Sequence, residues 1–171
     1  MRIIAPLLAI AVSACGAAPA PSPETVNLVI LSIDTLRPDH LGVYGYPRET
    51  SPNLDRFADR AVVFDQAVTV HVATAPAHGT ILTGRYPASH GIRRNGMRLA
   101  PDVPTLAEAF AARGYATGGL VSGWNLESHT GLDRGFATYD DALGAPRAGA
   151  RRTGARTTKA ALKWLRRLVA D

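Results

Sequence analysis

Apolar and polar positions along the chain follow the periods of strands and helices in turn. Residues 25–33, TVNLVILSI, form a near-continuous β-branched and aliphatic run, which is typical of a strand buried on both faces in a mostly parallel sheet. The runs at 61–68 and 115–123 predict two further strands.

Helix signals separate these strands. Ser51 followed by Pro52 predicts a helix start, with the serine as its cap. Thr105 and Glu108 have the spacing of a capping box, and Gly114 stands where that helix would end. Strands and helices therefore alternate, which predicts an α/β layered fold with right-handed crossovers.

The segment 156–171 predicts a helix with Ala161, Leu165 and Leu168 on one face and basic residues largely opposite. Two interpretations stay open: a helix that covers a sheet, or a basic helix on a membrane surface. Because a helix of this kind in an α/β fold leads into another strand, we expect the chain to stop between elements.

Positive charge is concentrated at the same end of the chain. The formal net charge is +5 over 171 residues, and residues 145–171 hold eight of the 19 Lys and Arg residues with one acid. This run has one aromatic residue on which a nucleic-acid base could stack, Trp164, and no recognisable nucleic-acid-binding motif. Nucleic acid is therefore not an expected partner.

The N-terminus resembles an export signal. Arg2 precedes the apolar run 3–12, which is shorter than the roughly 20 residues of a membrane span. The single cysteine, Cys15, ends the string VSAC and resembles a bacterial lipoprotein signal; a plain signal peptide is the alternative. We expect a signal and lipidation site over 1–15, an Ala/Pro-rich tether over 16–24, and a folded body over 25–171 of an exported protein, lipid-anchored to the periplasmic or extracellular face of the cell envelope.

Two positions are candidates for chemistry. Asp34 follows the first predicted strand, where it is either a ligand or base at the carboxyl end of the sheet, or the start of a turn. Thr74 lies in HVATAPAHGTILTGRYPASHG, residues 71–91, and Pro76 favours a helix starting beside it. Thr74 is then either a helix cap or a nucleophile at a terminus that binds tetrahedral anions.

Three segments resemble the sulfatase family of the alkaline-phosphatase-like superfamily. They are NLVILSIDTLRPDHLGVYGYPRETSPNLDRFADRAVVFDQAV, TAPAHGTILTGRYPASHGIRRNG and PTLAEAFAARGYATGGLVSG. The resemblance implies a mostly parallel sheet with helices on both faces. It also implies a fold that is incomplete at the C-terminus, since the family completes its metal site with an Asp-Asn or Asp-His pair far downstream, and Asp140 and Asp141 stand in the wrong region to replace it.

The resemblance assigns roles to individual residues. Asp34 matches the family's divalent-cation ligand, and Thr35 follows where many sulfatases have a second aspartate. Thr74 matches the nucleophile, which would also contact the cation, and His78 stands where arginine is common. His78 would contact a sulfate or phosphate oxygen, protonate a leaving group, or hydrogen-bond the groups around the nucleophile.

Other positions depart from the family's pattern or lie outside its chemistry. The family's Lys and His after the GYATG strand are absent, with Ser122 and Asn125 in that neighbourhood. Arg85, His90 and Asn95 are expected to be packing or turn residues.

Threonine changes the chemistry that the resemblance implies. Sulfatases convert Cys or Ser to formylglycine, whereas threonine resembles the superfamily's phosphotransferases, in which a metal-bound threonine alkoxide attacks phosphorus. We expect a metal-dependent hydrolase of small sulfate or related phosphate esters, as part of a longer protein, with calcium or magnesium as the cation and manganese or zinc as alternatives. A threonine-dependent phosphoryl transferase of the cell envelope and a non-catalytic envelope protein that binds an anion are the rival predictions.

Overall fold

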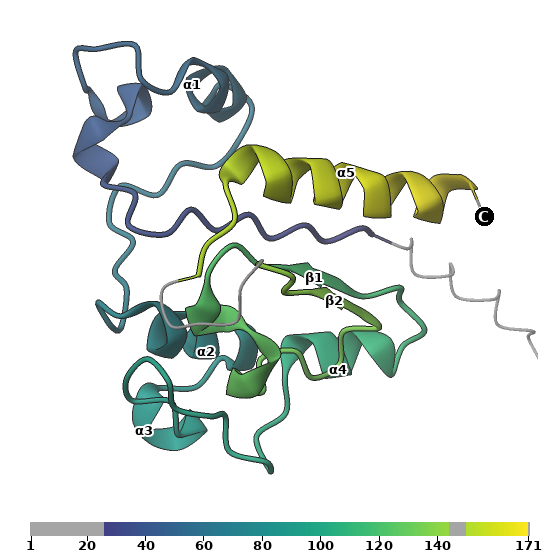
Figure 1. The fold of residues 1–171 in the computed structure, drawn as a ribbon. Coiled ribbons are helices and arrows are strands. Elements are labelled where there is room, and N and C mark those ends of the chain that lie inside the picture. Colours follow the sequence, from purple (N-terminus) through teal and green to yellow (C-terminus); the bar gives the residue numbers. More distant parts are fainter. Residues whose placement is uncertain (1–25, 144–149, 171) are drawn as a thin grey trace, which may run out of the picture. The chain divides into compact units, whose positions relative to one another are not determined.

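The computed structural model describes residues 26–143 and 150–170. The predicted signal peptide, Cys15 and the tether lie outside these residues. The chain divides into two units at Ile33, and each is considered by itself. The helices are α1 (Pro52–Ala58), α2 (Thr74–Thr83), α3 (Pro87–His90), α4 (Leu106–Ala111) and α5 (Gly154–Ala170); the strands are β1 (Gly118–Leu120) and β2 (Thr138–Asp140); and the short 3-10 helices are η1 (Pro38–His40), η2 (Gly42–Tyr44), η3 (Trp124–Leu126) and η4 (Ser128–Thr130) (Figure 1).

A parallel pair of strands organises the second unit. β1 and β2 pair with Gly118 opposite Thr138 and Leu120 opposite Asp140. Helix α5 lies on one face of this pair and α4 on the other (Figure 1). The ring of Trp164 in α5 occupies the space beside Gly118, where an added Cβ would come within 2.4 Å of it. The predicted α/β fold with parallel strands is confirmed, and β1 lies inside the predicted strand at 115–123.

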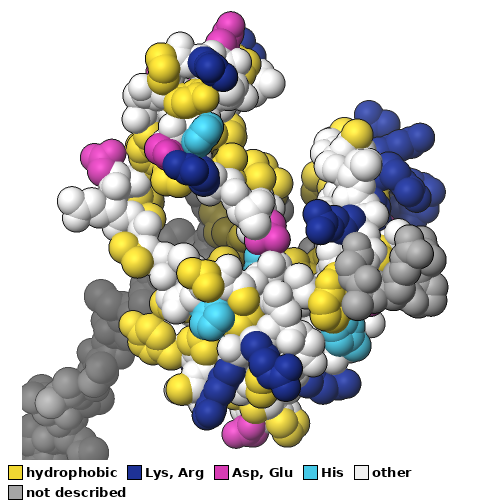
Figure 2. Space-filling model, turned by 60° about the vertical axis from the view of Figure 1, so that its left-hand side comes forward, with side chains coloured by type: hydrophobic (Ala, Val, Ile, Leu, Met, Phe, Trp, Pro, Cys, Tyr) yellow, Lys and Arg dark blue, Asp and Glu magenta, His cyan; other side chains and the backbone are white. Residues whose placement is uncertain are grey.

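The other two predicted strands are not formed. Residues 26–33 and 61–68 carry no strand, and their apolar side chains are exposed, with Val29 at 74% and Val62 at 80% of full exposure. Figure 2 shows hydrophobic side chains spread over the visible surface. A β-branched run becomes a strand when neighbouring strands pair with its backbone. Neither run is a strand in the structure, so the two strands that the local pattern predicted here are wrong.

The helices predicted after Ser51 and Thr105 are formed, because helix starts depend on neighbouring residues. The capping box of α4 is present: the Thr105 hydroxyl accepts the Glu108 N–H at 3.1 Å, and the Glu108 carboxylate accepts the Thr105 N–H at 2.7 Å. α1 begins after Ser51 as predicted, but Ser51 does not cap it. The Ser51 hydroxyl instead donates to Asp55 and accepts the Gly42 N–H, because a carboxylate one turn on competes for it.

The α5 helix forms as predicted and is only partly covered. It begins at Gly154, two residues before the predicted start. Trp164 packs beside the sheet, whereas Leu165 and Leu168 stay 40% and 42% exposed. No helix in the described part of the chain is long and apolar enough to cross a membrane.

A small apolar core lies between α2 and the loops that follow it. It contains a single residue of α2, Ala75, and further residues from the loops on either side of α4. Leu82 of α2 packs against this cluster from the side. The first and last turns of α2 are therefore fixed on one core, which is built from Ala75, Ile92, Leu99, Val103 and Leu132.

A buried arginine ties α5 to the carboxyl ends of the two strands. The Arg152 side chain is 5% exposed, and its Nη1 lies 2.8 Å from Asp140 Oδ1. Its Nη2 donates to the carbonyls of Val121 at 2.7 Å and Asp140 at 3.2 Å, and its Nε donates to the Thr157 hydroxyl at 3.2 Å. This one side chain therefore joins β1, β2 and the first turns of α5.

Replacing Arg152 with methionine should destabilise the fold. The change removes the charged partner of the Asp140 carboxylate and the donor to the Val121 carbonyl, and breaking a largely buried pair in this way costs roughly 3 kcal/mol. Urea unfolding followed by circular dichroism measures the loss. The neighbouring exposed Arg151→Met is the matched control, and equal effects of the two changes would contradict the role given to Arg152.

Candidate active site

Thr74 and Asp34 meet at the start of α2. Thr74 is the first residue of this helix, and the capping position belongs to Ala73. The Thr74 hydroxyl donates to Asp34 Oδ2 at 3.1 Å across forty positions of sequence. The prediction that Thr74 caps the helix is therefore wrong, since its hydroxyl donates to a carboxylate and does not accept a backbone N–H of the helix. The hydroxyl stands at the positive end of a helix dipole with a proton acceptor beside it.

The turn that carries Asp34 is strained. Thr35 has φ of +59°, and it is the one non-glycine with positive φ among residues 26–143 and 150–170. A β-branched residue in this region costs roughly 1–3 kcal/mol, and such residues cluster at functional sites. The strained turn directly adjoins the carboxylate that accepts from Thr74.

His78 lies one helical turn beyond Thr74. Its Nδ1 is 2.8 Å from the Thr74 carbonyl oxygen, and a carbonyl only accepts, so Nδ1 carries the proton. In the neutral ring the lone pair then belongs to Nε2. The roles predicted for His78 toward a substrate stay predictions.

The backbone N–H groups in the first turn of α2 are mostly engaged. Pro76 has no N–H, and the Ala77 N–H donates to Ala73 at 3.2 Å. The Ala75 N–H donates to the side-chain oxygen of Asn95 at 2.9 Å. Within the described part of the chain the Thr74 N–H makes no hydrogen bond, so it is the donor left for an anion. The sequence predicted Asn95 only as a packing or turn residue, and its contact with Ala75 carries no local signal.

His90 fixes the middle of the same helix. It is fully buried at the end of α3, its Nδ1 accepts the Ile92 N–H at 3.1 Å, and its Nε2 lies 3.2 Å from the Thr80 hydroxyl. Burial lowers the pKa of His90 below its ordinary value of 6.5. The ring lies against Gly79, where a Cβ would come within 2.7 Å of it. His90 is a packing residue, as predicted.

Three of the remaining positions, Ser122, Asp140 and Asp141, are engaged in the fold. The Ser122 hydroxyl lies 2.7 Å from that of Thr157. Asp140 pairs with Arg152, and Asp141 accepts the Ser128 N–H, which lowers the pKa of Asp141. The buried side-chain oxygen of Asn125 has no hydrogen-bond partner among the described residues.

A cation site is incomplete in the described residues. In 26–143 and 150–170 no three His, Cys, Asp or Glu side chains gather as they do around a metal. Asp34 and Thr74 provide two oxygen donors, whereas calcium binds six to eight oxygens and magnesium needs a full octahedron. These residues alone therefore do not fit a complete divalent-cation site.

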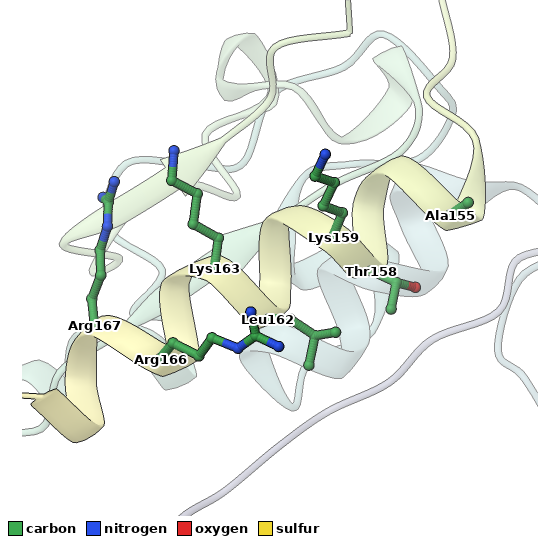
Figure 3. Close-up of a pocket in the computed structure, with 7 residues that line it drawn as sticks. All are labelled: Ala155, Thr158, Lys159, Leu162, Lys163, Arg166 and Arg167. Carbon is green, nitrogen blue, oxygen red and sulfur yellow. The ribbon is translucent and has the colours of Figure 1, made fainter.

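An open hollow of about 850 Å³ runs along α5. Its lining residues all belong to this one helix: Ala155, Thr158, Lys159, Leu162, Lys163, Arg166 and Arg167 (Figure 3). It shares no residue with the contact between Asp34 and Thr74. The α5 hollow is therefore separate from the candidate active site.

The sequence profile of the sulfatases matches residues 26–157. The chain belongs to the sulfatase family. It is 36% identical over 107 residues to an ulvan-active sulfatase of Formosa agariphila, a match that covers 63% of this chain and 21% of the relative. It is 38% identical over 122 residues to arylsulfatase A of Bos taurus, covering 66% and 23%. It is 35% identical over 153 residues to the N-acetylgalactosamine-6-sulfatase of Canis lupus familiaris, covering 82% and 29%.

A solved structure supports the same assignment. A Bacteroides thetaiotaomicron protein assigned to the sulfatases matches with a TM-score of 0.53 and 25% identity, over 64% of this chain and 24% of that one. The chain therefore spans about a quarter of the length of the relatives it matches. The family resemblance predicted from the sequence is confirmed.

Gly79→Ala should disturb α2. The new methyl group would overlap the His90 ring, which is held by hydrogen bonds at both nitrogens, and overpacking of this kind costs about 1–3 kcal/mol. Urea unfolding measures the loss. Gly154→Ala in α5 is the matched control, because a Cβ there meets nothing within 4 Å. An unchanged stability of Gly79→Ala would show that the ring is not fixed against the helix.

Acidification should destabilise the fold through His90. Because its folded pKa is depressed, the unfolded chain binds the proton first, so the free energy of unfolding falls as pH drops below 6.5 toward the folded pKa. Urea unfolding at about pH 7.5 and about pH 5.5 measures this slope. His90→Gln should be less stable at both values but should lose that part of the slope. A slope that the substitution leaves unchanged would contradict the assignment.

Proposed function

We propose that this chain carries the nucleophile of a sulfate-ester hydrolase, with Thr74 as the attacking residue. The hydrogen bond from the Thr74 hydroxyl to Asp34 at the start of α2 carries the proposal. The named relatives include sulfatases active on ulvan and on N-acetylgalactosamine-6-sulfate groups, which favours sulfate esters. Closely related phosphate esters follow as a second substrate class, because the same tetrahedral oxyanion fits the site.

The geometry supports a direct displacement. The Thr74 oxygen attacks sulfur or phosphorus, and its proton passes to the Asp34 carboxylate that already accepts its hydrogen bond. The bond from the central atom to the ester oxygen breaks, and that oxygen leaves with the alcohol portion. Water then hydrolyses the resulting threonine ester. The helix N-terminus, with the Thr74 N–H open, stabilises the negative charge that develops on the oxyanion.

A divalent cation is part of this proposal, and it would polarise an ester oxygen and lower the pKa of the Thr74 hydroxyl. Asp34 and Thr74 would be two of its oxygen ligands. The steps assigned to this chain's own residues do not depend on it. The strained Thr35 turn supports Asp34 in this position, since strain is retained where the orientation of a side chain matters.

Phosphoryl transfer by threonine is the second candidate. The hydroxyl of Thr74 is already paired with a proton acceptor, so it needs no conversion to formylglycine to serve as a nucleophile. A non-catalytic anion-binding protein of the envelope is the third. In each case we propose an exported protein anchored through Cys15, because small residues precede this lone cysteine after an apolar run.

Hydrolysis of an aryl sulfate and an aryl phosphate by the mature chain, with and without divalent cations, tests the function. Thr74→Ala should lower the rate by about a hundredfold or more, because it removes the attacking oxygen. Thr74→Ser is the matched control, since it keeps the hydroxyl, and should retain activity. Equal rates for wild type and Thr74→Ala would exclude Thr74 as nucleophile. Saturable sulfate binding without hydrolysis of either ester would favour the anion-binding protein.

A further inference from the structure

Asn95 is placed to control the first turn of α2. Its side-chain oxygen accepts the Ala75 N–H at 2.9 Å, and Ala75 is fully buried in the core. Ala75 follows Thr74 directly, so this bond fixes the peptide group that joins the two residues. The orientation of that peptide determines the direction in which the Thr74 side chain leaves the helix.

The loop that carries Asn95 is itself fixed. Gly96 has φ of +82°, a conformation that favours glycine, and turns the chain directly after Asn95. The ring of Trp124 in η3 lies beside this turn, 3.9 Å from the position of a Cβ on Gly96. η3 also packs against α2. Asn95 is therefore held between its own turn and the helix it contacts.

Asn95 and His90 hold α2 at two different points. His90 contacts Thr80 in the middle of the helix, and Asn95 contacts Ala75 at its start. The two residues are joined by the short segment around Ile92, which is fully buried. Because this segment is hydrogen-bonded to α2 at both places, it constrains the position of the helix along its axis as well as the direction of its first turn.

We propose that Asn95 is a positioning residue for the nucleophile. By holding the Ala75 N–H it keeps the Thr74 side chain in the one rotamer that directs the hydroxyl at Asp34. It also occupies the neighbouring donor, so that the Thr74 N–H is the one presented to an incoming oxyanion. This proposal rests on the proposed function of Thr74, although its geometric part stands on the bond between Asn95 and Ala75.

Two substitutions separate positioning from general stability. Asn95→Ala removes the acceptor, whereas Asn95→Asp keeps an oxygen acceptor for the Ala75 N–H and adds a negative charge beside the anion site. NMR measures the exchange rate of the Ala75 amide and the χ1 rotamer of Thr74 from its three-bond couplings in the full chain. The Leu99 amide, which donates to Thr130 at 2.8 Å, reports on the rest of the core.

In Asn95→Ala we expect the Ala75 amide to exchange roughly five- to tenfold faster, as the loss of one hydrogen bond implies. We also expect Thr74 to average over several rotamers while Leu99 exchange stays unchanged. Asn95→Asp should restore both readouts at Ala75 and Thr74. A single Thr74 rotamer in Asn95→Ala would overturn the proposal, and so would faster Leu99 exchange by the same factor, because Asn95 would then act only on stability.

Titration with inorganic sulfate separates this inference from the proposed function. The wild-type Thr74 amide should shift saturably, and Asn95→Asp should bind sulfate roughly tenfold more weakly because of the like charge. If wild type shows no sulfate binding, the proposed anion site is wrong, while the rotamer result still decides the role of Asn95. If Asn95→Asp binds sulfate as well as wild type does, the oxyanion does not lie beside Asn95 and the second part of the proposal is overturned.

Discussion

The close approach of the His90 ring to Gly79 is the constraint on which the candidate site depends. A side chain at Gly79 would leave no room for the ring, and the ring in turn reaches Thr80 and the Ile92 N–H. Burial of the neutral imidazole is tolerated because both nitrogens are hydrogen-bonded. This contact fixes α2 in the core, and the position of α2 places Thr74.

The site itself combines a fixed helix with a strained turn. α2 brings a hydroxyl and an open N–H to its positive end, and the turn at Thr35 brings a carboxylate to the same point. The Thr74 hydroxyl therefore has a carboxylate proton acceptor within hydrogen-bond distance. Within the described residues, Asp34 and Thr74 bring two oxygen donors together, and no group of three His, Cys, Asp or Glu side chains surrounds them.

Features that depend on neighbouring residues were predicted well from the sequence, and contacts between residues far apart in the sequence were not. The capping box of Thr105 and Glu108 forms because both groups belong to one turn, whereas Ser51 fails to cap α1 because Asp55 and Gly42 compete for its hydroxyl. The run at 61–68 has strand composition but no pairing partner among the described residues. Asp34 and Thr74 were singled out separately, one at the end of a predicted strand and one beside a helix start, and the family resemblance then assigned their roles. No periodicity predicts that residues so far apart share a hydrogen bond. The hydrogen bond between Asn95 and Ala75 could not be predicted for the same reason.

In the proposed function, Thr74 attacks the ester directly. Peptide mass spectrometry of the chain, quenched in acid during incubation with an aryl phosphate or an aryl sulfate, tests it most directly, because the first step leaves the phosphoryl or sulfuryl group on the nucleophile. If Thr74 is the nucleophile, this group is found on the peptide that contains Thr74, and on its hydroxyl when the peptide is fragmented. Turnover of the ester with the group on another residue, or with Thr74 unmodified at every quench time, would contradict it.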